Sequence, residues 1–176
     1  PFLLFKFATD REYRRGLGER LGGIPRRQGD RPCLWLHCSS VGEVTLARPL
    51  VRELQARRPD VELNISTMTP AGRDHAEKVF PGARVHFYPL DFTFCVRRAL
   101  RRVRPTAVVL VELEVWPNFI RGARRRHIPV AIVNGRMSHR SHRRYRRLIW
   151  YFRPIFRRLT RVGVQSEGYR ARLSEF

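Results

Sequence analysis

The stretch Cys33-Leu34-Trp35-Leu36-His37-Cys38-Ser39-Ser40-Val41-Gly42-Glu43 decides the fold of this chain. Its first residues form a short, almost continuous apolar run, which is typical of a strand buried on both faces of a parallel sheet. The two serines end the run, and residues 44–57 then space their apolar side chains as an amphipathic helix does. The stretch therefore predicts a strand, a short turn and a helix, which together begin a βαβ unit.

The same alternation continues along the chain. Short apolar runs are followed by helical patterns with short connections, so we expect right-handed crossovers and one parallel sheet. We expect Pro49 to lie near the start of its helix. The sequence predicts an α/β fold, a Rossmann-like open parallel sheet of six strands. Beyond residues 33–38, strands are predicted over 63–67, 85–88, 107–111, 130–133 and 162–164, and further helices over 9–21, 70–79, 92–103, 117–126 and 138–159, the last interrupted at Pro154.

Length and composition bound the class of protein. The 176 residues, 43% of them hydrophobic, suffice for one domain with a sizeable core. No apolar run approaches the roughly 18 residues that span a bilayer, and the opening run is too short for a signal peptide. The chain lacks an initiator Met and a new helix starts close to Phe176, so we expect it to be part of a longer protein.

Cysteine usage indicates a reducing compartment. Cys33, Cys38 and Cys95 are odd in number and lack CxxC spacing. We therefore expect reduced core thiols of a cytoplasmic protein, with no disulfide framework and no metal site.

Basic charge is concentrated in the second half of the chain. The formal charge is +21, and residues 97–161 contain 19 Arg against only Glu112 and Glu114. Such a field attracts phosphate groups on nucleic acid, on anionic lipids or on a phosphorylated substrate, and its sign alone does not choose among them. No RNA-binding motif or DNA-reading helix accompanies the charge, so we expect no nucleic-acid partner.

The polar turns after the strands are the expected ligand site, because ligands of open parallel sheets bind beyond the carboxyl ends of the strands. Gly42-Glu43 stands where a dinucleotide-binding domain carries GxGxxG, which disfavours binding of NAD. A carboxylate at a helix entrance, beside a glycine that lets a substrate approach, suits a general base. The alternative is that Glu43 only complements the helix dipole.

Two carboxylates, Glu112 and Glu114, follow the apolar run 107–111. If the strand continues through Glu114, alternation puts both on one face and they share a site. The alternative is that they are counter-charges for nearby arginines. The turn into the next helix is marked by Trp116-Pro117.

Other polar residues at these ends have plain structural roles available. His37 lies within an apolar strand, where a satisfied core histidine is the usual finding. Four hydroxyl residues stand at loop-to-helix junctions, where N-capping is the usual role. They are Thr67, Thr69, Ser138 and Ser166.

The segment 138–161 interleaves arginines with aromatic and aliphatic residues such as Tyr145, Trp150 and Phe152. This pattern suits a membrane interface or a phosphorylated lipid. The alternative is a helix whose apolar side packs on the sheet or on a second domain, while the arginine stems cover the surface.

Five motifs stand in a fixed order along the chain. They are WLHCSSVGE (35–43), STMTPAG (66–72), ELEVWPN (112–118), VNGRMS (133–138) and QSE (165–167). With these motifs the chain resembles, over nearly its whole length, the N-terminal half of the 3-deoxy-D-manno-octulosonic acid (Kdo) transferases of lipopolysaccharide biosynthesis. Residues 13–22 also resemble the segment that follows the family's N-terminal membrane anchor.

The resemblance implies a metal-independent, inverting glycosyltransferase of the GT-B type, with two Rossmann-like domains facing a cleft. On this basis residues 1–32 are a helical lead-in after a missing membrane anchor, and residues 33–176 are the acceptor-binding domain. The C-terminal domain, which binds the donor CMP-Kdo, is absent from this chain, so we expect the chain alone to be inactive. No cofactor and no metal are expected.

The resemblance also implies roles for individual residues. Glu43 is the expected general base, which deprotonates the acceptor hydroxyl, and Glu114 is favoured over Glu112 as a second site carboxylate. The expected acceptor-binding residues are Ser40, Gly42, Thr69, Glu112, Glu114, Arg136 and Ser166.

The resemblance implies two partners, a bisphosphorylated lipid A precursor and an anionic membrane. Both present phosphate groups that guanidinium groups bind, which gives a physical reason for the many arginines in residues 97–161. The implied location is the cytoplasmic face of the inner membrane. The first alternative function is a GT-B enzyme with another lipid or sugar acceptor. The second, which the sequence favours less, is a basic nucleic-acid-binding domain. The number of Kdo residues added stays open.

Overall fold

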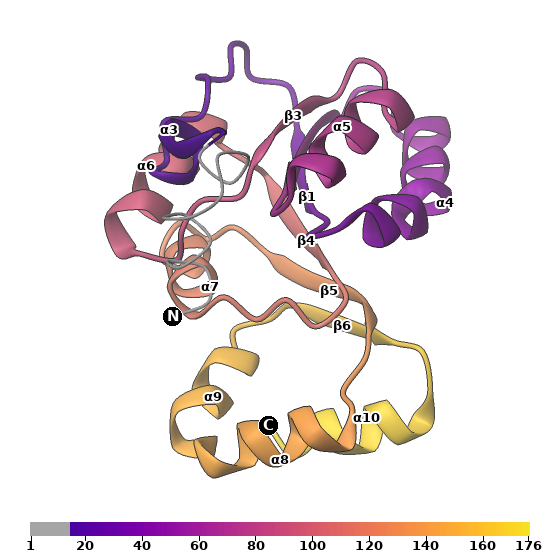
Figure 1. Cartoon of the computed structure of the whole chain (residues 1–176), viewed down its shortest axis with the longest axis vertical. Coiled ribbons are helices and arrows are strands. Elements are labelled where there is room, and N and C mark those ends of the chain that lie inside the picture. Colours follow the sequence, from indigo (N-terminus) through magenta and orange to yellow (C-terminus); the bar gives the residue numbers. More distant parts are fainter. Residues whose placement is uncertain (1–14) are drawn as a thin grey trace.

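A parallel sheet of six strands forms the centre of the chain, which the computed structural model describes over residues 15–176 (Figure 1). The strand order is β3-β2-β1-β4-β5-β6, and every neighbouring pair is parallel. This is the Rossmann order, so the predicted fold class is confirmed. The strands are β1 (Cys33–His37), β2 (Glu62–Thr67), β3 (Arg84–Phe87), β4 (Ala107–Val111), β5 (Val130–Gly135) and β6 (Arg161–Val164).

Helices cover both faces of the sheet. One face carries α4 (Val41–Arg57) and α5 (Pro70–Val79), and the other carries α6 (Thr93–Val103), α7 (Pro117–Arg124) and α9 (Ile149–Phe156). Successive side chains of β1 point to opposite faces of the sheet and so contribute to both hydrophobic cores. Trp35 packs in the cluster with Phe119, and Leu36 packs in the cluster with Val51. Two further helices, α8 (His139–Arg147) and α10 (Glu167–Leu173), lie with α9 at one end of the molecule (Figure 1).

Side-chain caps fix where several helices begin. Ser40, Thr69, Ser138 and Ser166 are the N-caps of α4, α5, α8 and α10, and each accepts a hydrogen bond from a backbone N–H of the first turn. Thr67 is not a cap, because it lies buried at the end of β2 and donates to the Thr69 carbonyl. The capping role expected for the four hydroxyls is thus confirmed for three of them.

Both proline predictions are wrong. Pro49 lies in the middle of α4 rather than near its start. Its position is exposed, so the carbonyl that lacks a partner there can bond water instead. The long basic helix breaks at Leu148, not at Pro154, which lies inside α9. The break folds α9 back onto α8, so that Phe152 packs edge-on against Tyr145 with ring centroids 4.7 Å apart.

The segment before β1 packs on the sheet and on α6. Residues 1–14 lie outside the described residues, and of the helix predicted over 9–21 the structure describes α3 (Leu17–Arg20). Gly22 has φ 81°, and a Cβ on it would lie 2.4 Å from the Cys95 carbonyl oxygen, so only glycine fits this turn. Ile24 joins the main core, and Arg27 donates to the Val103 carbonyl.

The three cysteines are free and buried, as expected. Burial raises the pKa of Cys33 to about 11 and that of Cys38 still further, so neither thiol is reactive at neutral pH. Within residues 15–176, no helix combines the length and the hydropathy that crossing a bilayer requires.

Candidate active site

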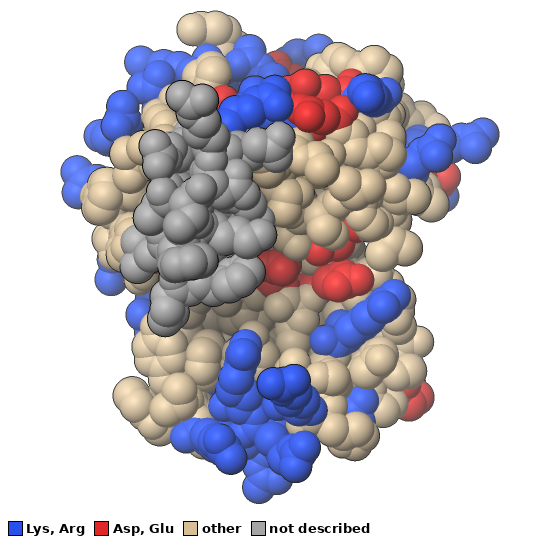
Figure 2. Space-filling view, in the orientation of Figure 1, with Lys and Arg blue, Asp and Glu red and all other residues tan. Residues whose placement is uncertain are grey.

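The loops after β1 and β4 lie beside each other, because these two strands pair directly. The strand order reverses between them, since β2 and β3 extend the sheet on one side and β5 and β6 on the other. In open α/β sheets this switch point opens a crevice beyond the carboxyl ends of the strands. Figure 2 shows acidic atoms in a hollow at the middle of this view, between the body of the sheet and the basic end that carries α8.

Glu43 occupies the first turn of α4 and is held by the residues before the helix. The Ser39 backbone N–H donates to Oε2 at 2.7 Å, and the Ser39 hydroxyl donates to Oε1. The Ser40 hydroxyl lies 3.2 Å from Oε1 and caps the Glu43 N–H. This resembles a capping box, in which a serine N-cap and a glutamate three residues later satisfy the helix start reciprocally.

Opposing effects set the charge of Glu43. Burial raises the pKa of its carboxyl above the ordinary value, and the nearby charge of Glu112 adds to this. The hydrogen bonds from Ser39 and Ser40 lower it, because they stabilise the anion. A carboxylate that is fixed, mostly buried and raised in basicity is what a general base requires.

Glu114 lies close enough to Glu43 for the two carboxyl groups to interact electrostatically. Its Oε2 accepts a hydrogen bond of 2.8 Å from the Trp116 indole N–H. Burial, and then the charge of Glu43, raise the pKa of Glu114 to about 7, although Trp116 and Ser39 act in the opposite direction. The Glu43–Glu114 pair therefore carries less than two charges near neutral pH.

The condition under which alternation aligns Glu112 with Glu114, a strand that continues through Glu114, is not met. β4 ends at Val111, and Glu112 has φ 61°, so the chain turns away from the strand at that residue. The charge of Glu112 nevertheless acts on both Glu43 and Glu114, so the three carboxyl groups lie near one another. The turn at Glu112, rather than strand alternation, brings them together. Glu112 Oε1 lies 3.9 Å from Nε of the exposed Arg136, which is the counter-charge role considered as the alternative.

The other predicted site residues lie at different depths. Gly42 is exposed, and a Cβ on it would meet only the Ser40 Oγ within 4 Å, at 3.9 Å, so the space above it is open. Thr69 caps α5 through the Gly72 N–H, and Gly72 packs against the backbone at Ser40, which places this helix start next to the β1 loop. Ser166 is exposed and caps α10, with no described contact to the carboxylates.

Sequence reasoning missed Ser39 and Asp91. Ser39 is the main donor to Glu43, and only its place four residues before a helix-entrance glutamate signals this. Asp91 accepts from the Asn118 N–H at 3.0 Å and from the Phe119 N–H at 2.8 Å, so it caps α7 from another loop. No local pattern announces that contact, because the residues lie far apart in sequence.

His37 is a core histidine, as expected, but it is not fully satisfied, because its buried Nε2 has no hydrogen-bond partner among the described residues. It is fully buried, its Nδ1 lies 3.1 Å from the Ser66 carbonyl oxygen, and its ring stacks on Tyr88 at 3.9 Å. Burial lowers the pKa of His37 to about 3, so the ring is neutral at physiological pH. It forms part of the floor beneath the site rather than a ligand set. Within the described residues, no group of three or more His, Cys, Asp or Glu side chains is arranged to hold a metal ion.

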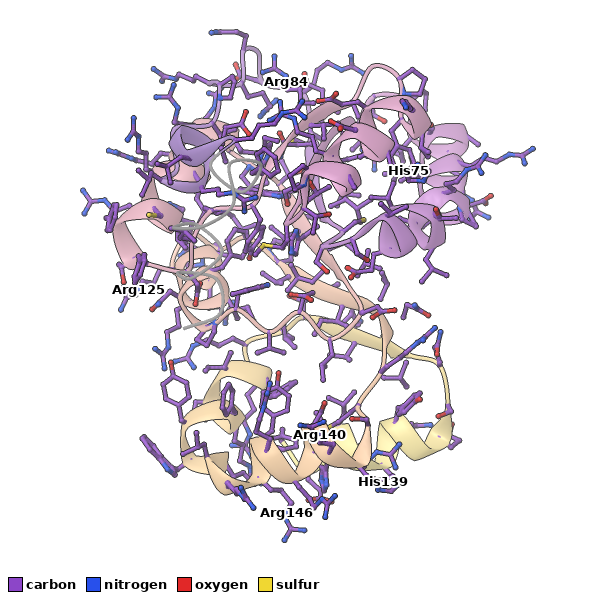
Figure 3. The ribbon with its side chains drawn as sticks, in the orientation of Figure 1. His75, Arg84, Arg125, His139, Arg140 and Arg146 are labelled. Carbon is purple, nitrogen blue, oxygen red and sulfur yellow. The ribbon has the colours of Figure 1, made fainter. Side chains whose placement is uncertain are left out.

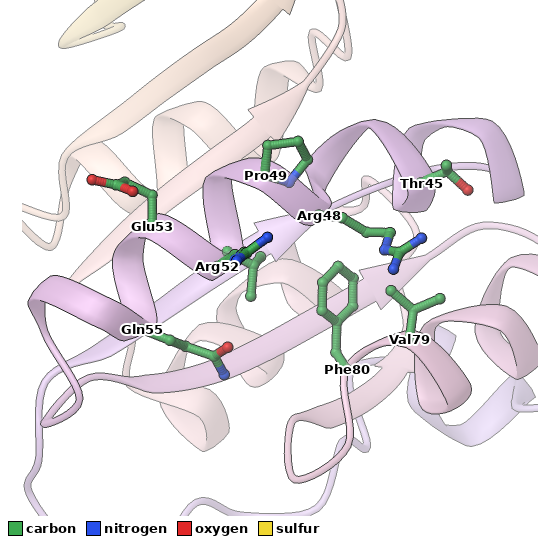
Figure 4. Close-up of a pocket in the computed structure, with 9 residues that line it drawn as sticks. Thr45, Arg48, Pro49, Arg52, Glu53, Gln55, Val79 and Phe80 are labelled. Carbon is green, nitrogen blue, oxygen red and sulfur yellow. The ribbon is translucent and has the colours of Figure 1, made fainter.

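A separate hollow runs along the flank of α4, and none of the predicted site residues lines it. Figure 4 shows Arg48 and Arg52 of α4 beside Phe80 there. Thr45 lies at the end of this hollow that is nearest the start of α4. The Oγ1 of Thr45 is 3.0 Å from Nε2 of His75. The hollow is thus distinct from the switch-point site.

The fold and the site together define a class of protein. This class is the Rossmann-type domain with a carboxylate site at the switch point of its sheet. Comparison with known proteins gives the family: the model of 3-deoxy-D-manno-octulosonic-acid transferase (kdotransferase) matches residues 15–176. The chain belongs to this family, as the motifs indicated.

Three relatives illustrate the match, and each is named 3-deoxy-D-manno-octulosonic acid transferase. The protein of Haemophilus influenzae is 35% identical over 160 residues, which are 88% of this chain and 36% of the relative. That of Chlamydia pneumoniae is 32% identical over 176 residues, 96% of this chain and 40% of the relative. That of Bordetella pertussis is 36% identical over 148 residues, 81% of this chain and 34% of the relative. The chain thus spans well under half the length of these relatives.

Proposed function

We propose that this chain is the acceptor-binding domain of a GT-B glycosyltransferase of lipopolysaccharide biosynthesis, which moves Kdo from CMP-Kdo to a lipid A precursor. The family match and the Rossmann order support the assignment. In this proposal a second domain binds most of the donor, and the acceptor enters the hollow at the β1–β4 switch point.

The fixed position of Glu43 carries the proposal. Its carboxylate is oriented by Ser39 and Ser40 and lies beside the open space over Gly42. An acceptor hydroxyl reaching this space gives its proton to Glu43, and its oxygen attacks the anomeric carbon of Kdo. The bond from that carbon to the phosphate oxygen breaks, and CMP leaves with the electron pair. A single displacement of this kind inverts the anomeric configuration and needs no metal or cofactor in the proposed step.

Glu114 has a supporting role in this mechanism. With its pKa at about 7, it is largely protonated below neutral pH and then adds no second charge beside Glu43. In its protonated form it offers an O–H donor to a sugar hydroxyl. Glu112 and Arg136 stand at the rim, where Arg136 is exposed and available to a phosphate of the acceptor.

The proposed location is the cytoplasmic face of the inner membrane. The segment 138–161 divides its aromatic residues between two environments. Tyr145 and Phe156 pack in a core cluster with Phe176, whereas Trp150 is 73% exposed. The packing interpretation therefore holds for part of the segment, and the exposed part stays available to lipid.

The test is product analysis with the complete protein that contains this chain. It is given CMP-Kdo and a lipid A precursor, with and without EDTA, and the products are identified by mass spectrometry and their anomeric configuration by NMR. We expect inverted Kdo linkages in both conditions, and no transfer by residues 1–176 alone. Transfer only to a different lipid or sugar acceptor would favour the alternative enzyme. Retention of configuration, or loss of transfer with EDTA, would overturn the mechanism.

A further inference from the structure

Helices α6, α7 and α9 form one layer on the face of the sheet opposite α4 and α5 (Figure 1). α6 and α7 approach closely, because a Cβ on Gly122 of α7 would lie 2.9 Å from Val96 Cγ1 of α6. Arg121 of α7 lies over the ring of Tyr151 of α9 at 5.0 Å. The outer side of this layer is therefore a continuous surface made by three helices.

A groove between α6 and α7 is lined by four arginines: Arg97, Arg121, Arg125 and Arg126. α6 and α7 contain no Asp or Glu. Among residues 15–176, no carboxylate pairs with any of the four guanidinium groups. Figure 3 shows Arg125 on this side of the molecule, away from Arg140 and Arg146 of α8. The groove thus gathers an excess of positive charge, although the charge of Asp91 acts on Arg121 from the loop before α6.

The groove arginines repel one another, and this repulsion affects the pKa of Arg126. Burial lowers the pKa of its guanidinium, and the charges of Arg97 and Arg101 lower it further. Like charges that repel in a partly buried groove are relieved by an anion, and a phosphate oxygen pair matches the guanidinium fork.

Exposed aromatic rings border the groove. Phe92 and Phe94 are 56% and 62% exposed, and their rings stack with centroids 6.2 Å apart. They line a second hollow with Arg97, Arg98 and Arg101. Arg97 lines both hollows, so the aromatic pair and the arginine groove are continuous. Trp150 of α9, at 73%, has the highest exposure of the exposed large apolar side chains in the described residues.

We propose that the outer surface of α6, α7 and α9 docks on a bilayer of anionic phospholipid, with lipid phosphates in the groove between α6 and α7. Phe92, Phe94 and Trp150 then lie at the level of the headgroups, where amphipathic and aromatic side chains are favoured. Charge complementarity favours this occupant, since the charged side chains that line the groove are all arginines and the rings offer apolar contact beside them. The inference extends the membrane location proposed above, but it does not depend on sugar transfer.

The test is sedimentation of this chain with phosphatidylcholine vesicles that contain or lack phosphatidylglycerol. The variant Arg97→Gln/Arg125→Gln is compared with Arg48→Gln/Arg52→Gln, which removes the same charge from the flank of α4. Each basic residue near an anionic surface contributes enough that losing two weakens binding on the order of tenfold or more. We expect this loss for the groove variant and a much smaller loss for the control. Circular dichroism checks that both variants are folded.

A second readout reports the aromatic contact. Brominated lipids quench tryptophan fluorescence only at close range. We expect quenching that the Trp150→Phe variant largely removes, because Trp35 is fully buried and Trp116 is half-buried and donates to Glu114 at the switch-point site. Equal loss of binding in both double variants, or binding that ignores phosphatidylglycerol, would overturn the docking surface. So would displacement of the chain from vesicles by RNA at equal phosphate concentration. Because no donor or acceptor sugar is present, these outcomes are separate from failure of the proposed transferase activity.

Discussion

Ser39 holds the Glu43 carboxylate at both oxygens, through its backbone N–H to Oε2 at 2.7 Å and through its hydroxyl to Oε1. The contact joins the end of β1 to the first turn of α4, so the strand positions the proposed base directly. It also means that the charge of Glu43 depends on a residue that is not itself expected to react.

Ser39→Ala should shift the pH dependence of transfer. Removing the hydroxyl takes away a donor that stabilises the anion, so the pKa of Glu43 rises. The acidic limb of kcat/KM in the complete protein then moves to higher pH. Ser174→Ala, at an exposed hydroxyl in the last turn of the chain, is the control. A parallel drop at all pH values, with no shift of the limb, would show that Ser39 does not tune Glu43.

Gly42→Ala should separate folding from acceptor access. Gly42 has open space around it and lies in a helix, so alanine should leave stability unchanged or raise it by up to about 1 kcal/mol. If the acceptor closes on this point, the added methyl lowers kcat/KM for the lipid acceptor. Gly18→Ala, at a helical glycine with equally open space, is the matched control. Full transfer activity in the Gly42 variant would place the acceptor elsewhere.

Glu114→Gln should remove a pH-dependent loss of stability. The folded pKa of about 7 lies above the ordinary value of a glutamate, so the folded state binds more protons in that window and stability falls as pH rises through it. The glutamine variant should be more stable than the parent at pH 8, by about 1–2 kcal/mol after allowance for partial contact with water, and equal to it below pH 4. Urea unfolding across this range measures the difference, with the exposed Glu53→Gln as control. An unchanged slope would mean that Glu114 titrates normally.

Asp91→Ala should destabilise the fold although Asp91 belongs to no helix. It accepts from two N–H groups at the start of α7, which has no cap of its own. Its loss leaves these donors without a partner, at a cost of about 1–3 kcal/mol. Asp30→Ala is the control, since that side chain is 95% exposed. Equal midpoints of thermal unfolding for the two variants would contradict this role.

Local patterns predicted the sheet well because the central strands β1, β4 and β5 are apolar runs of distinctive composition. Trp35 and Leu36 pack on opposite faces, as a strand buried on both sides requires. The break at Leu148 escaped prediction, because it depends on the packing of Phe152 against Tyr145 rather than on a breaker residue.

The parts of the site that depend on sheet topology could be predicted, and the parts that depend on single backbone dihedral angles could not. The position of Glu43 at the carboxyl end of the sheet could be predicted because this residue follows the first strand. The positive φ of Glu112 ends the alternation that was used to align it with Glu114, and no neighbouring glycine signals this turn. The Asp91 cap escaped for a similar reason, since it forms between two loops that only the folded sheet brings together.

The most direct test of the account compares Glu43→Gln with Glu53→Gln in the complete protein. Both residues lie on α4, and Glu43 lies at the β1–β4 switch point whereas Glu53 lines the separate hollow on the flank of the helix. The measurement is the rate of Kdo transfer from CMP-Kdo to a lipid A precursor, with folding checked by thermal unfolding. We predict that Glu43→Gln lowers the rate by about 100-fold or more, the size of a lost general base, while Glu53→Gln leaves it unchanged. Transfer at the parental rate by a folded Glu43→Gln protein would contradict the account.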